Sequence, residues 1–84
     1  MLISMRECRM VRAEIRKLQE PFPIAVVIVI APSEKAAQQE GEKLLKPYLG
    51  GYPNRLGFTD LGSILFQAEP TTIFLYTKQD GRII

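Results

Sequence analysis

Eight consecutive apolar residues decide the fold of this chain: Ile24-Ala25-Val26-Val27-Ile28-Val29-Ile30-Ala31. Six of the eight are β-branched, and polarity does not alternate along the run. Runs of this kind form strands that are covered on both faces, as in the middle of an α/β sheet. A membrane span needs about 20 apolar residues, so this run is too short to cross a bilayer. The sequence therefore predicts a buried central strand over residues 24–31.

A helix is predicted directly after this strand. Ser33 is a suitable N-cap, because its side-chain oxygen can accept a backbone N–H of the first turn. The inner stripe of the helix starts with small residues, Ala37 and Gly41, which would let the helix lie close to the strand. Pro47 and Gly50 mark the place where the helix weakens and stops.

Residues 4–20 carry the pattern of an amphipathic helix. Ser4 and Glu7 fit a capping box. The apolar residues that follow recur at intervals of three and four, as one helical stripe does: Cys8, Val11, Ile15 and Leu18. Pro21 would end the helix, because proline has no backbone N–H. The alternative is a long strand, but it would mix arginines with Cys8 and Met10 on one face, so the helix is preferred.

The rest of the chain is predicted as a loop, an ambiguous element and a strand. Residues 50–57 read as a loop, since glycine, proline and asparagine are concentrated there. Residues 58–68 fit either a short helix or a strand. Residues 71–77 predict a strand, with Ile73 and Leu75 on one face and Phe74 and Tyr76 on the other. Asp80-Gly81 is a turn signal, and residues 82–84 are expected to pair as a stub or to fray.

The predicted fold class is α/β, with α+β as the alternative. The expected order in one small two-layer domain over residues 1–84 is helix, strand, helix, ambiguous element, strand. Two helices cover the apolar strands only in part, and a chain of 84 residues has a thin margin of stability. Both features predict self-association, most simply as a homodimer.

Charge is concentrated in the first segment, and it suggests the first candidate site. Residues 1–20 hold five of the eleven basic and three of the nine acidic residues, so the whole net charge of +2 lies there. On a helix, Arg9, Arg12 and Arg16 would share one flank. This flank fits a solvated rim, a contact to a second copy that pairs Glu7 with Arg12, or a phosphate-binding surface.

A second candidate is the loop that holds Tyr52, Asn54 and Arg55. An aromatic ring and a guanidinium in one loop suit stacking on a base or contact with a phosphate. The same residue types are also ordinary in turns. Tyr52 and Arg55 are therefore candidate binding residues alongside Arg9, Arg12 and Arg16.

Other sites have weak support. The turn at Ser33 offers a helix N-terminus to an anion, but Glu34 competes for that position. Gly57 and Gly62 have the spacing of a phosphate loop, yet Ser63 stands where that motif needs lysine. Histidine is absent and Cys8, the only cysteine, lies on an apolar stripe, so we expect no catalytic residue, no metal site and no cofactor.

The expected function is a small non-enzymatic protein–protein interaction or regulatory module that forms a homodimer. The alternative is a nucleic-acid-binding module that uses the arginines named above. Charges begin at residue 6, which leaves no apolar core for a signal peptide, so a cytoplasmic protein without a membrane partner is expected.

Overall fold

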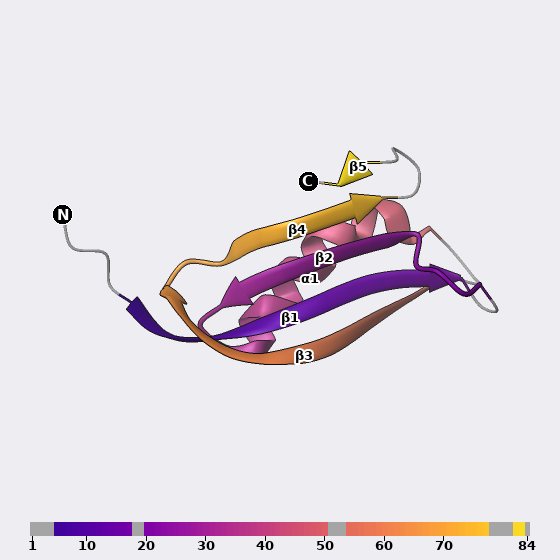
Figure 1. Cartoon of the computed structure of the whole chain (residues 1–84). Helices are drawn as coiled ribbons and strands as arrows, with labels where there is room; N and C mark the ends of the chain where they lie inside the picture. Colours follow the sequence, from indigo (N-terminus) through magenta and orange to yellow (C-terminus); the bar gives the residue numbers. More distant parts are fainter. Residues whose placement is uncertain (1–4, 18–19, 51–53, 78–81, 84) are drawn as a thin grey trace.

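The structure is a computed structural model that describes residues 5–17, 20–50, 54–77 and 82–83. In chain order, its elements are β1 (Met5–Lys17), β2 (Ala25–Ala31), α1 (Glu34–Leu49), β3 (Asn54–Gln67), β4 (Thr71–Thr77) and β5 (Arg82–Ile83). The strands form one sheet in the order β3-β1-β2-β4-β5, with every neighbouring pair antiparallel. α1 packs across one face of this sheet, behind it in Figure 1. The fold is therefore a small α+β arrangement, and a strand rather than a helix comes first.

β2 occupies the centre of the sheet, as its apolar sequence predicts. It lies between β1 and β4, and every residue from Ala25 to Ala31 except Ile28 is buried. Helix packing covers one of its two faces, and on the other face no element among the described residues covers it. β2 is antiparallel to both neighbours, so the sheet fits the α+β alternative rather than an α/β arrangement.

β1 corrects the prediction of a helix over residues 4–20. Residues 5–17 form a strand that pairs with β2 on one side and with β3 on the other. Val11, Ala13 and Ile15 alternate with charged residues and are buried on the face toward α1. This odd-numbered stripe is the apolar side that a strand requires. Pairing along both edges outweighs the local helix signals of the segment, a common case of tertiary context overriding propensity.

α1 begins as predicted and lies very close to the sheet. The Ala36 N–H donates to Ser33 Oγ at 3.1 Å, which confirms Ser33 as the N-cap. Gly41 faces β1, and a Cβ placed on it would stand 2.9 Å from the Cβ of Ala13. The helix continues past Pro47 and ends at Leu49. The small residues predicted at the helix–sheet contact therefore serve that purpose.

The core lies between α1 and the two strands beneath it. Its buried members share the face of the sheet that α1 covers: Val11, Ala13, Ile15, Ala25, Val27, Val29, Ala31, Ala37 and Leu45. Cross-strand pairing brings them together, because Val11 lies opposite Val29 and Ala13 opposite Val27. The apolar layer is thus built from three residues of β1, four of β2 and two of α1.

β3 resolves the ambiguous element and shortens the predicted loop. Residues 54–57 belong to the strand rather than to a loop, and residues 58–67 continue it. The register with β1 shifts at Leu61, which leaves a bulge that Gly62 completes with a φ of 112°. Only glycine adopts such a φ readily. β3 then curves beyond the end of β2, still paired with β1 as far as Met5, and leads to β4 (Figure 1).

β4 and β5 match the prediction for the end of the chain in most respects. β4 spans the predicted residues 71–77, and Phe74 and Tyr76 lie on one face. The prediction for Ile73 differs from the structure: Ile73 is the extra residue of a bulge, since Ile28 pairs with Phe74 and Val29 pairs with Thr72. Arg82 and Ile83 pair with β4 as a short stub. The predicted turn at Asp80-Gly81 lies outside the described residues.

The contact at Gly41 leads to a test of helix packing. Replacing Gly41 with Leu forces a side chain against Ala13 and Val27, so we expect a loss of about 1–3 kcal/mol in unfolding free energy. Glu42→Leu places the same side chain one residue away at an exposed position and serves as the control. Urea denaturation of both variants measures the difference. Equal losses in the two variants would contradict the packing described here.

Candidate interaction surface

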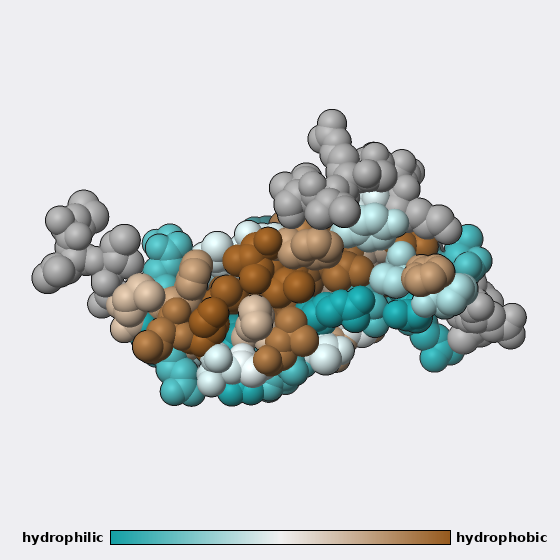
Figure 2. Space-filling view, in the orientation of Figure 1, coloured by the Kyte–Doolittle hydropathy of each residue, from teal (hydrophilic) through white to brown (hydrophobic). Residues whose placement is uncertain are grey.

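No described element covers the face of the sheet opposite α1. Val27 and Val29 point to α1, and successive strand residues alternate, so Val26, Ile28 and Ile30 point away from it. Cross-strand partners share a face, which adds residues of β1 and β4. We call this surface the open face and define it by Met10, Arg12, Glu14, Val26, Ile28, Ile30, Phe74 and Tyr76. Figure 2 shows it as a continuous apolar band with a hydrophilic area on one side.

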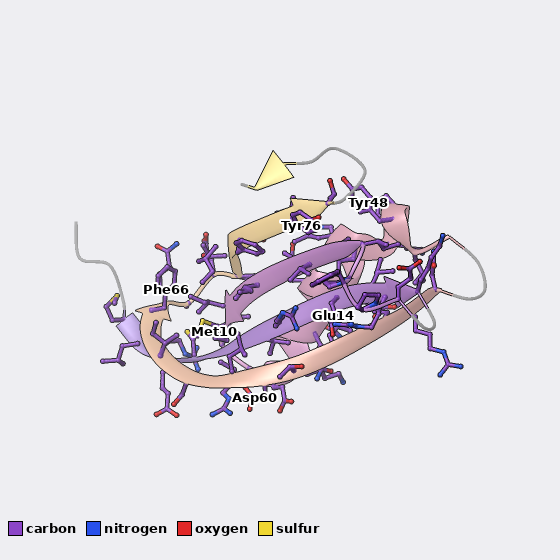
Figure 3. All side chains as sticks on the ribbon, turned by 45° about the vertical axis from the view of Figure 1, so that its right-hand side comes forward. Met10, Glu14, Tyr48, Asp60, Phe66 and Tyr76 are labelled. Carbon is purple, nitrogen blue, oxygen red and sulfur yellow. The ribbon has the colours of Figure 1, made fainter. Side chains whose placement is uncertain are left out.

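The open face is arranged in rows that run across the strands. Glu14, Val26 and Tyr76 form one row, and Arg12, Ile28 and Phe74 form the next. Val26 is 5% exposed and Ile30 is 2% exposed, although α1 lies on the other side of the sheet. Their neighbours shield them and remain half-buried themselves. The result is an apolar surface whose two charged members, Arg12 and Glu14, both belong to β1; Met10, Glu14 and Tyr76 are labelled in Figure 3.

Three charged side chains that follow one another along β1 on this side, Arg12, Glu14 and Arg16, are linked by ion pairs. Glu14 Oε2 accepts hydrogen bonds or ion pairs from Arg12 Nη2 at 3.1 Å and from Arg16 Nη2 at 3.3 Å. Arg16 Nη1 also donates to the Pro21 carbonyl at 2.8 Å. Among the described residues, none donates to Glu14 Oε1. The two arginines are held in place by one carboxylate oxygen, and the second oxygen is free to accept.

Arg55 joins this basic end from the neighbouring strand. It lies opposite Arg16 in the register between β1 and β3, so the two side chains share a face. Arg55 is exposed and forms no ion pair with any residue that the structure describes. Like charges in adjacent positions repel, which makes this end suitable for an anion.

Arg9 lies on the opposite face, which corrects the predicted arginine flank. A helix would have grouped Arg9 with Arg12 and Arg16, whereas in a strand residue 9 points the other way. Arg9 forms an ion pair with Asp60 of β3, near the start of α1. The predicted pairing of Glu7 with Arg12 in a helical dimer also fails, because no helix exists there. Tyr52 lies outside the described residues.

The ion pair of Arg9 with Asp60 shifts both pKa values in the expected directions. The hydrogen bond from Arg9, together with the Gly62 N–H that donates to Asp60 Oδ1 at 3.2 Å, lowers the pKa of Asp60 below its ordinary value of 3.8. The hydrogen bond to Asp60 raises the pKa of Arg9 further. The pair fixes the bulge of β3 to β1.

Beyond the end of β2, β1 and β3 continue as a two-stranded ribbon. Residues 5–8 pair with residues 64–67 there, because the pairing of β1 with β2 stops at Arg9. Leu65 is 67% exposed and Met5 is 59% exposed. Cys8 is buried, with its Sγ 3.7 Å from the Phe66 carbonyl, as expected of a packed thiol. Met5 and Glu7, the cross-strand partner of Leu65, are odd-numbered like Val11, so the exposed Met5 and Leu65 lie on the opposite side of the sheet from the open face.

The apolar, aromatic and charged side chains described above suit the binding of a partner. No group of three acidic, cysteine or histidine residues suited to a metal ion occurs among the described residues. Nor does the described part of the chain contain a helix long and apolar enough to cross a membrane. Gly57 and Gly62, whose spacing is that of a phosphate loop without its lysine, lie within a strand. Comparisons with protein family models, with curated proteins and with solved structures find no match.

Sequence reasoning identified Arg12, Arg16 and Arg55 but missed Glu14 and the aromatic pair as parts of one surface. The alternation of positive, negative and positive side chains at residues 12, 14 and 16 was the available signal, since a period of two is that of a strand. Phe74 and Tyr76 were placed on one face of their strand. Their position beside Ile28 and Val26 depends on the strand order.

The Asp60 carboxylate leads to a prediction of pH dependence. Because the folded pKa is lowered, the contribution of this group to stability is complete above its ordinary pKa of 3.8 and is lost as the pH falls through the lower folded pKa. NMR titration of the side chain in the wild type should therefore show a midpoint below 3.8. Arg9→Gln should raise that midpoint toward 3.8, while the Gly62 N–H keeps part of the shift. An unchanged midpoint in Arg9→Gln would contradict the assignment of Arg9 as the main cause.

Proposed function

We propose that this protein is a small non-enzymatic interaction module that binds a protein surface, in the first place a second copy of itself, through the open face. One observation carries the proposal: the most apolar strand of the chain has α1 on one side and no described element on the other. Large continuous apolar surfaces on small domains mark sites of interaction. A regulatory role and a cytoplasmic location stay predictions from the sequence.

The size of the domain supports the same proposal. A chain of 84 residues buries a modest fraction of its surface, and one helix is the only described cover for a sheet that is apolar on both faces. Association through the open face would bury Ile28, Phe74 and Tyr76 more fully. It would thereby add a second apolar layer to the first.

The proposal is tested by the mass of the protein in solution. Light scattering at micromolar concentration should give twice the chain mass of 9.5 kDa for the wild type. Ile28→Asp places a charge in the centre of the open face, so this variant should give the mass of one chain. Lys43→Asp, on the exposed side of α1, is the control and should behave as the wild type.

Circular dichroism shows whether each variant keeps its fold. Phe74→Gln, a milder change on the same face, should also weaken association and replaces Ile28→Asp if that variant unfolds. A wild-type protein that stays monomeric up to several hundred micromolar would overturn self-association through this face.

A second candidate function is the binding of single-stranded nucleic acid on the same side of the sheet. The observation that favours it is the grouping of Arg12, Arg16 and Arg55 at one end of a surface that also presents Phe74 and Tyr76. Sheets that present aromatic rings and basic side chains stack bases and contact phosphates. This retains the nucleic-acid alternative with Arg55 in place of Arg9.

Fluorescence anisotropy with labelled single-stranded RNA and DNA oligonucleotides tests this candidate. Affinity should fall linearly with the logarithm of salt concentration, and replacing Arg16 and Arg55 together by Gln should flatten that slope by about 1–2. Arg9→Gln removes a charge from the opposite face and should leave the slope unchanged. Absence of binding at low salt, or an equal effect of both variants, would exclude the candidate.

A further inference from the structure

We infer that the occupant of the open face is a second copy related by a two-fold axis that passes between the Arg12 and Glu14 rows, so that Arg12 of each copy pairs with Glu14 of the other. This inference rests on the proposed function and specifies its geometry. It starts from the two charged side chains that stand within an apolar surface.

Burying the open face against another sheet would take Arg12 and Glu14 out of water. Their side chains are now 34% and 19% exposed. A charge that loses its solvent without a partner is costly, whereas a charge that meets an opposite charge with good hydrogen bonds is tolerated. Arg12 and Glu14 are already paired with each other at 3.1 Å. An occupant that offers an acid opposite Arg12 and a base opposite Glu14 would add a second partner to each charge as the pair loses its solvent.

A second copy offers this pattern because the two charges differ in sign and lie two residues apart on one strand. In a two-fold contact, residue i meets residue j and j meets i. With the axis perpendicular to the strands and midway between the rows, Arg12 lies over the second copy's Glu14, and Glu14 lies over the second copy's Arg12. Both buried charges are then paired by one operation.

The same axis matches the apolar residues of the other two strands. Val26 shares the row of Glu14, and Ile28 shares the row of Arg12, so Val26 lies over the second copy's Ile28. On β4, Tyr76 lies in the row of Glu14 and Phe74 in the row of Arg12. Tyr76 of each copy therefore lies over Phe74 of the other copy. Aromatic pairs of this kind add stabilisation beyond the area that they bury.

Other two-fold arrangements of the two sheets give these charges no opposite charge across the interface. An axis through the row of Arg12 places this arginine against itself. An axis parallel to the strands and centred on β2 sets β1 against β4, which puts Arg12 over Phe74 and Glu14 over Tyr76. Only the axis between the two rows pairs both charges.

Glu14 fits this contact. Both present bonds of Glu14 end on Oε2, so Oε1 has capacity for the second copy's Arg12. Aligned sheets that pack face to face stand about 10 Å apart, which long side chains from both sheets can span.

A charge exchange between two different chains tests the inference. Arg12→Glu gives a chain with two acids at these positions, and Glu14→Arg gives a chain with two bases. Each variant alone should dimerise at least tenfold more weakly than the wild type, because like charges meet across the axis. An equimolar mixture should form heterodimers well above the statistical half of all dimers, measured by native mass spectrometry of differently tagged chains.

The mixture separates a contact between chains from the bond within one chain. Either substitution breaks the present Arg12–Glu14 bridge, and mixing cannot restore a bridge inside a chain. The matched control is Arg9→Glu mixed with Asp60→Arg, which exchanges the charges of the ion pair on the opposite face and should give no preference for heterodimers.

The outcomes also distinguish this inference from the proposed function. Suppose that Ile28→Asp abolishes the wild-type dimer but the mixed variants form heterodimers only at or below the statistical fraction. This result would overturn the proposed axis and leave the open face as the interaction surface. A monomeric wild type would overturn both. Preferred heterodimers with an inactive control pair would support the two-fold contact.

Discussion

The close packing of α1 on β1 and β2 is the contact on which the rest of the structure depends. Gly41 lies so near Ala13 that no side chain fits between them, and Val27 fills the space beside it. This contact buries the odd-numbered residues of both strands in one layer. It also determines which face of the sheet is left for other uses.

A single helix on a sheet with two apolar faces has a clear physical consequence. The even-numbered residues of β2 are as apolar as the odd-numbered ones, yet no helix among the described residues covers them, and side chains of β1 and β4 lie beside them. The charged residues of β1 stand at one side of this surface and are paired with each other. Burying this surface would add a second apolar layer without any change of backbone, which is why a flat partner such as a second sheet suits it.

Part of the candidate site could be predicted from the sequence, although for an incorrect structural reason. Arg12 and Arg16 share a face in the strand as they would on the predicted helix, because residues four apart coincide in both periods. Arg9 separates from them, since three residues is close to one helical turn but odd in a strand. Arg55 reaches the same surface through the register of β3 with β1, which depends on residues about 40 positions apart.

The sequence by itself determined β2, α1 and β4, because each depends on local properties. An unbroken β-branched run, a serine cap before an apolar stripe and an aromatic alternation each favour one conformation without help from distant residues. Tertiary structure alone decided that β1 and β3 are strands and that they lie side by side. Each of these segments carries mixed local signals, and the backbone hydrogen bonds that stabilise them form only when residues 5–17 and 54–67 meet.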